Sequence, residues 1–107
     1  MKIPKQIKIA GFNYTVERKD APFVSADGSA LDGQHRYADK TIVVAHSGCK
    51  EYQDVVFLHE MIHAIIENYV SPMEHDELFV EQLSKGLYQV LVDNPSIFSE
   101  GKEITDV

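Results

Sequence analysis

The chain has a single cysteine, and it does not begin with an apolar segment. Cys49 is the only cysteine among 107 residues, so no disulfide can form within the chain. The opening residues, Met-Lys-Ile-Pro-Lys-Gln, are too polar for a secretory signal. Both features favour a reducing compartment, and we expect the protein to be in the cytoplasm.

Basic residues are also scarce. The sequence has 10 Lys and Arg against 17 Asp and Glu, which gives a formal net charge of −7. An acidic chain repels phosphate backbones, so we expect no nucleic-acid partner. Long apolar runs are missing too. No run approaches the ~20 residues that span a bilayer, so we expect no membrane partner either.

The length of the chain fits one compact domain and is too short for two. We therefore predict a single domain over residues 1–107. Within it, residues 1–48 are expected to be rich in β-structure and residues 50–94 to be helical, with a short tail over 95–107.

Apolar and polar residues alternate in the first part of the chain, as they do in half-buried strands. This alternation, interrupted by Gly11, predicts a β-hairpin with strands over 6–10 and 12–18. Residues 19–33 are rich in Asp, Gly and Pro and are expected to form a loop. A second pair of strands is predicted over 34–38 and 41–46, joined by a tight turn at Asp39 and Lys40.

The second part of the chain has the apolar period of helices. We predict a first helix over 51–69 and a second over 75–93. The apolar stripe of the first falls at positions 55, 58, 62, 65, 66 and 69, and that of the second consists of Phe79, Val80, Leu83, Leu87, Val90 and Leu91. The sequence thus predicts an α+β fold, in which a small antiparallel or mixed sheet packs on the first helix and a second helix follows.

A His-Glu-x-x-His motif over residues 59–63 lies on the first predicted helix. His59 and His63 are four residues apart, so they project from one face, about one turn apart, and can hold one Zn²⁺ together. Glu60 follows the first histidine and has the position of a general base rather than a ligand. Apolar neighbours would bury most of this helix, and buried imidazoles without partners are costly. A ligand role therefore explains the pair better than chance does.

A catalytic zinc site usually has three protein ligands and one position open to water. The third ligand must come from an element that folds back on the first helix, and the start of the second helix does so after a short link. Glu77 precedes Val80 of the apolar stripe by three residues, which predicts that it lies on the buried side of the helix, at the metal end, and favours it as the third ligand. Glu81 is the main alternative and His75 a weaker one. In a competing interpretation, Glu77 is only a first-turn acid that suits the helix dipole.

Two further histidines lie on the predicted strands or at their ends. For His35 and His46, a satisfied surface or half-buried histidine is the default interpretation. Either could instead approach the metal and help to hold an oxyanion.

The metal motif and the start of the second helix together resemble a known group. They are similar to the small zinc metallopeptidase-like proteins of bacteriophages and mobile elements, to the ImmA/IrrE family and, more distantly, to the thermolysin-type gluzincins. In these families the third ligand is a glutamate on the following helix, which matches Glu77. The resemblance covers roughly residues 33–95 and rests on His59-Glu60-Met61-Ile62-His63-Ala64-Ile65, on Glu77-Leu78-Phe79-Val80, and on Gly86-Leu87-Tyr88-Gln89-Val90-Leu91 followed by Asp93-Asn94-Pro95.

The resemblance implies a minimal zincin-like domain and a metallopeptidase activity. One zinc ion would activate a water, and Glu60 would act as general base in the hydrolysis of a peptide bond. The substrate would be a protein or peptide, and the gene would belong to a phage or mobile element, so that the protein works in the cytoplasm of the host. A substrate peptide is expected to add to the edge of the strand over 41–46.

Two other functions are compatible with the same residues. One is a zinc-binding module for protein recognition that has lost turnover, and the other is a structural zinc site that clamps the two helices. Glu60 distinguishes them from an enzyme, because a structural site needs the two histidines and Glu77 but has no use for Glu60.

Overall fold

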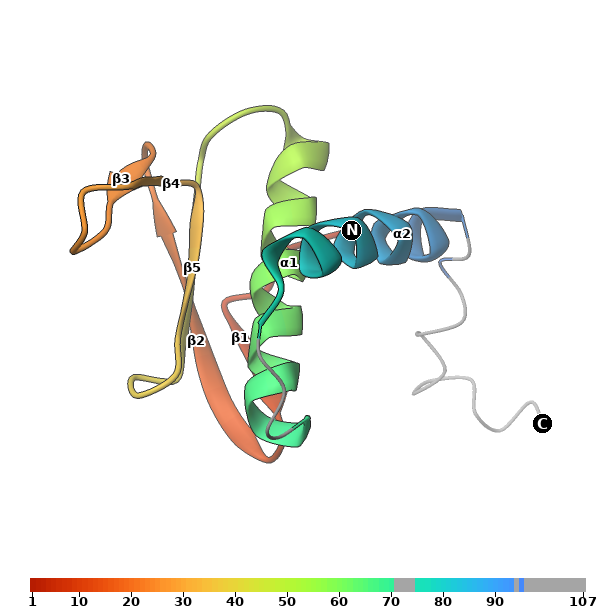
Figure 1. Cartoon of the computed structure of the whole chain (residues 1–107). Coiled ribbons are helices and arrows are strands. Elements are labelled where there is room, and N and C mark those ends of the chain that lie inside the picture. Colours follow the sequence, from red (N-terminus) through yellow and green to blue (C-terminus); the bar gives the residue numbers. More distant parts are fainter. Residues whose placement is uncertain (71–74, 94, 96–107) are drawn as a thin grey trace.

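The computed structural model describes residues 1–70, 75–93 and 95, and it shows the predicted α+β fold: a small mixed sheet and two helices (Figure 1). The tail predicted over 95–107 lies, except for Pro95, outside the described residues. Neither helix is long and apolar enough to cross a membrane in the part of the chain that is described. The elements in chain order are β1 (Gln6–Ile9), β2 (Phe12–Lys19), β3 (Phe23–Val24), β4 (Ala30–Leu31), β5 (Gly33–Arg36), β6 (Thr41–Ala45), α1 (Lys50–Tyr69) and α2 (Glu77–Asp93).

The main sheet has four strands in the order β1-β2-β6-β5. The predicted hairpin is confirmed, since β1 and β2 pair antiparallel around a turn in which Ala10 and Gly11 have positive φ angles. Strand β6 pairs parallel with β2 and antiparallel with β5, which makes the sheet mixed. Strand β6 therefore lies inside the sheet, and β1 and β5 form its two edges.

The connections between strands differ from two of the predictions. The stretch over 19–33 is not only a loop, because β3 and β4 pair as a short antiparallel ribbon within it. The turn between β5 and β6 spans four residues rather than two: the backbone N–H of Lys40 donates to the carbonyl of Tyr37 over 3.1 Å, and Lys40 has a φ of 52°. Both are short local pairings that composition alone does not reveal.

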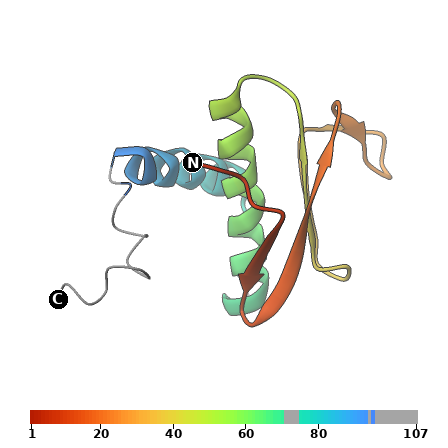
Figure 2. The same ribbon diagram turned by 180° about the vertical axis from the view of Figure 1, so that it is seen from behind.

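Helix α1 packs along one face of the sheet (Figures 1 and 2). The predicted stripe is only partly right. Leu58, Ile62 and Ile66 are buried, but Tyr69 is 68% exposed, and the stripe missed the buried Phe57. Tyr69 is the last residue of α1, and Ile66 is the buried residue of the final turn. The core between sheet and helix consists of Ile9, Tyr14, Val16, Ile42, Val44, Phe57, Leu58 and Ala64.

Helix α2 crosses α1 at a steep angle and projects away from the sheet (Figures 1 and 2). The stripe predicted for it is wrong in part, since Phe79, Leu83 and Val90 are between 45% and 48% exposed. Only Val80 and Ser84 are buried within this helix. Besides the buried Val80, the side chains of Leu87, Tyr88 and Leu91 pack on the core, and an apolar period cannot tell which apolar residues of α2 do so.

Candidate metal centre

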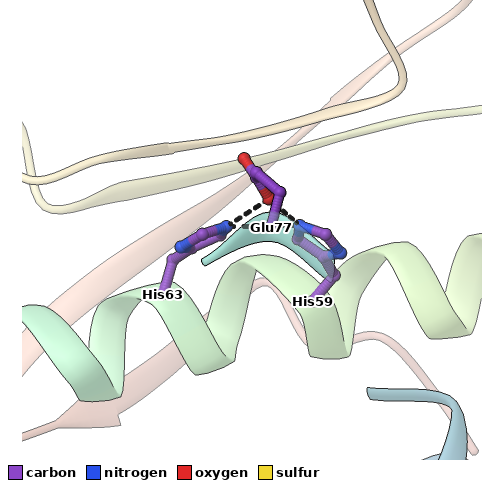
Figure 3. Close-up of side chains that lie close together, drawn as sticks. All are labelled: His59, His63 and Glu77. Atoms are coloured by element: carbon purple, nitrogen blue, oxygen red, sulfur yellow. Dashed lines mark hydrogen bonds and ion pairs between the residues drawn. The ribbon is translucent and has the colours of Figure 1, made fainter. Parts of the chain in front are cut away.

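Three side chains from the two helices converge at the start of α2 (Figure 3). The Nε2 atoms of His59 and His63, one turn apart on α1, are 3.2 Å from each other. The Oε1 atom of Glu77 lies 2.9 Å from Nε2 of His59 and 3.0 Å from Nε2 of His63. In the described part of the chain this is the group of side chains that could hold a metal ion. The residues predicted as ligands are thus brought together, and metal binding itself remains a prediction.

The start of α2 is fixed by a cap and by a single buried apolar residue. The Asp76 carboxylate accepts a hydrogen bond from the backbone N–H of Phe79 over 3.1 Å, so Asp76 acts as N-cap and Glu77 becomes the first helical residue. One turn later, Val80 is fully buried against Ile62 and Ile66 of α1. We expected the helix to begin at residue 75. An acidic cap three residues before Phe79 is the signal that places the beginning at Glu77.

Glu77 reaches the histidines from the outer surface. Its side chain is 73% exposed, so the expectation that it lies on the buried side of α2 is wrong. Burial raises the pKa of the Glu77 carboxyl, but hydrogen bonds to His63 and His59 outweigh this effect, and the net result is a lowered pKa. Glu77 is therefore an anion supplied to the histidines from the solvent side.

The other two candidate ligands contact the opposite nitrogens of the same histidines. Glu81 places Oε1 3.0 Å from Nδ1 of His59, and His75 places Nδ1 2.7 Å from Nδ1 of His63. The Nε2 atom of His75 in turn lies 3.5 Å from the Glu67 carboxylate. Glu81 and His75 therefore do not join the convergent group but orient its imidazoles, the role that outer partners play around metal ligands.

These contacts are compatible with the proton arrangement that a metal requires. When Nδ1 of His59 donates to Glu81 and Nδ1 of His63 donates to His75, both Nε2 atoms carry lone pairs. Burial lowers the pKa of His63, which also favours the neutral imidazole that a metal requires. Two lone pairs and the Glu77 oxygen then face one another, and only a proton or a cation between them relieves the repulsion.

The donor set fits zinc. Two imidazoles and a carboxylate are the ligands of one common type of catalytic zinc site, and ligand bonds of 2.0–2.1 Å in a tetrahedron separate neighbouring donors by about 3.3 Å. The separations here are between 2.9 and 3.2 Å. Small side-chain adjustments would be enough for these three residues to hold the ion, which would supply a position for water or substrate.

Glu60 is the buried carboxylate next to this group. It is only 9% exposed, and burial raises its pKa from 4.5 to about 7, with the charge of His59 opposing and that of Glu77 assisting the shift. A carboxyl group with a pKa near neutrality can both accept and return a proton at physiological pH. This is the property that the general-base prediction for Glu60 requires.

The raised pKa also predicts how the stability of the metal-free protein depends on pH. Below pH 4.5 burial of Glu60 does not reduce the free energy of unfolding through its charge, because the carboxyl group is protonated in both the folded and the unfolded state. The cost grows between pH 4.5 and 7 and is complete above pH 7, where it reaches about 3 kcal/mol for a shift of this size. Urea denaturation in chelator at pH 4.5 and pH 8 should show that Glu60→Gln stabilises the protein at pH 8 but not at pH 4.5. An equal effect at both values would contradict the buried carboxylate.

Gly33 allows Glu60 to lie close to the edge strand β5. A Cβ atom on residue 33 would lie 2.5 Å from Cγ1 of Val56 and 3.1 Å from both Cγ and Oε2 of Glu60. Glycine at this position therefore allows β5 to approach α1 and leaves room for the carboxylate. From the sequence we expected Gly33 to be only a loop residue, because a close approach between distant segments leaves no local pattern.

Substituting Gly33→Ala is therefore expected to separate β5 from α1 and displace Glu60. The β-branched Val56 has little rotamer freedom on a helix, so we expect a loss of 1–3 kcal/mol, about the cost of overpacking. Urea denaturation measures it. The matched control is Gly86→Ala on α2, where an added Cβ meets nothing within 4 Å and should stabilise by about 1 kcal/mol. A Gly33→Ala protein as stable as the parent would contradict the close approach.

The cluster of His59, His63 and Glu77 lies in a cleft of about 580 Å³ between α1, the edge strand β5 and the start of α2. His35 of β5 lines this cleft, whereas His46 lies outside it, 3.1 Å from the Arg18 guanidinium. Burial lowers the pKa of His35, and its Nε2 atom is buried without a hydrogen-bond partner among the described residues. Of the two further histidines considered from the sequence, only His35 is thus near enough to take part in chemistry.

A scan of the chain against protein-family models finds no match, and searches of curated proteins and of solved structures find none either.

Proposed function

We propose that the protein is a zinc-dependent peptidase that hydrolyses peptide bonds. His59, His63 and Glu77 would hold one Zn²⁺, and Glu60 would act as general base. The observation that carries the proposal is the convergence of two Nε2 atoms and one carboxylate oxygen in a cleft that also contains a buried glutamate. A structural zinc site would explain the three ligands but not the cleft or the buried Glu60.

The bound ion would supply a Lewis acid and a water of near-neutral pKa. Glu60 takes the proton of the attacking water as the carbonyl carbon becomes tetrahedral. The same carboxyl group can then deliver this proton to the leaving amine. Glu81 and His75 hold the two ligand imidazoles in the orientation in which Nε2 faces the cleft.

The strand expected to receive the substrate is the wrong one. We predicted peptide addition to the edge of the strand over 41–46, but β6 is paired on both sides, by β2 and by β5. The edge strands of the described sheet are β1 and β5, and of these two β5 lines the cleft. We therefore propose that an extended peptide pairs with β5, where its backbone groups find partners beside the metal ligands.

The proposal is tested by metal analysis combined with a peptide-library digest. Purified protein should contain about one zinc per chain and cleave peptides. Extraction of the metal with a chelator should abolish cleavage, and stoichiometric Zn²⁺ should restore it. Zinc bound without cleavage of any library peptide or protein would favour a recognition module or a structural site. Absence of stoichiometric metal would overturn the proposal as a whole.

A further inference from the structure

The cleft is strongly acidic. Its described lining includes neither lysine nor arginine, although it includes five carboxylates. These belong to Asp32, Glu60, Glu67, Glu77 and Glu81.

Three of the five carboxylates already have a role at the metal centre. Glu77 is the proposed ligand and Glu60 the proposed base. Glu81 contacts Nδ1 of His59 with one oxygen and Nζ of Lys85 with the other, at 3.0 and 3.3 Å. Asp32 and Glu67 remain, and the mechanism uses the charge of neither. Glu67 has only a weak partner, His75, at 3.5 Å, and its side chain is 43% exposed.

Asp32 and Glu67 lie on opposite sides of the ligand histidines along the cleft. The hydroxyl of Tyr52, in the first turn of α1, donates to Oδ2 of Asp32 over 2.6 Å, which fixes that carboxylate at the beginning of the helix. Glu67 follows His63 by one turn. Glu67 follows Tyr52 by fifteen positions, so about 22 Å of helix separates them, and β5 runs alongside this segment (Figure 1).

An extended peptide lying against β5 would place six or seven residues in this span, at about 3.3 Å per residue. The ligand histidines lie between the two carboxylates, so each carboxylate is two to four residues away from a peptide bond held at the metal centre. Asp32 can accept from Tyr52 and from a substrate ammonium at once, because a carboxylate has several acceptor positions.

We propose that the cleft selects cationic peptides, with lysine or arginine on each side of the bond to be cleaved, and that Asp32 and Glu67 determine this preference. The inference rests on the proposed peptidase function and names its substrate class. The net charge of −7 supports it, since an acidic molecule attracts basic peptides over long range.

The experiment measures binding separately from cleavage. Fluorescence anisotropy compares two labelled octapeptides of equal length, one with lysine three residues to each side of its central bond and one with glutamate at these positions. In metal-free protein at ~50 mM salt, we expect the lysine peptide to bind at least about tenfold more tightly, and the difference to shrink at ~0.5 M salt. In zinc-loaded protein the lysine peptide should be the better substrate.

The decisive variant is Asp32→Asn combined with Glu67→Gln, which should reduce the preference to about twofold. Its control is Asp20→Asn with Glu51→Gln, the same change of charge at exposed positions outside the cleft, which should preserve the preference. If the double variant fails to fold, as judged by circular dichroism, Glu67→Gln alone should reduce the preference about threefold.

The outcomes separate this inference from the proposed function. A lysine preference in binding without any cleavage would support the acidic cleft and overturn the peptidase. Cleavage of both peptides at equal rates with equal binding would overturn the charge preference and leave the peptidase. A preference unchanged in the Asp32 and Glu67 variants would also overturn the inference.

Discussion

Replacing Glu60 with glutamine is expected to lower kcat by about 10²–10⁴-fold while leaving one zinc bound per chain. The amide keeps the size of the side chain in its close contact with Gly33 but cannot accept a proton from water. Glu60 is also not among the three convergent ligands, so the metal should stay in place. The loss should fall on kcat rather than on KM, because the general base acts in the transition state and not in substrate binding.

The measurement combines steady-state kinetics on a cleaved library peptide with zinc analysis of the same preparation. Glu51→Gln is the matched control, since it makes the same chemical change at an exposed position in the first turn of α1. It should leave both kcat and zinc content unchanged. A Glu60→Gln protein that retains its zinc and more than a tenth of the parent kcat would show that another group takes the proton.

Replacing His63 with alanine is expected to weaken zinc binding by about 10²–10³-fold. Apparent zinc affinities of 10–16 kcal/mol for four-ligand sites correspond to roughly 3–4 kcal/mol for each ligand, or two to three powers of ten. Loss of His63 also leaves His75 without the imidazole that its Nδ1 contacts. The imidazole of His63 is buried, so water cannot readily replace it as a ligand.

Competition with a chromophoric chelator measures this affinity, and thermal denaturation gives a second readout. Zinc should raise the Tm of the parent, because an ion that binds only the folded state stabilises it, and should leave the Tm of His63→Ala nearly unchanged. His46→Ala is the control, as His46 is exposed and lies outside the cleft. Equal zinc affinity in His63→Ala and in the parent would mean that the imidazole is not a ligand.

The parts of the fold that local patterns encode were predictable from the sequence. The hairpin of β1 and β2 follows from the alternation around Gly11, and α1 follows from its apolar period and begins one residue before the expected position. The grouping of His59 with His63 needs only the geometry of one helix. Glu77 could be named because a catalytic zinc site requires a third ligand near the first two.

The parts that depend on distant segments were not predictable. The parallel pairing of β2 with β6 joins residues 26 positions apart, and it places β6 inside the sheet, so that β5 and not β6 has a free edge. The exposed position of Glu77 and the role of Glu81 depend on the crossing of the two helices. The apolar stripe of α2 has the same period whichever of its residues meet α1, so Leu83 and Phe79 could not be told apart from Val80.

The short stretch from His75 to Glu81 supplies the third donor and both groups that orient the histidines, on a helix with only two buried residues. If the proposed ion binds, the attachment of α2 to the remainder of the molecule would be coupled to metal binding. Binding of the ion would hold α2 in place, and its release would loosen the wall of the cleft that α2 forms. A bound ion would then stabilise the fold as well as take part in the reaction.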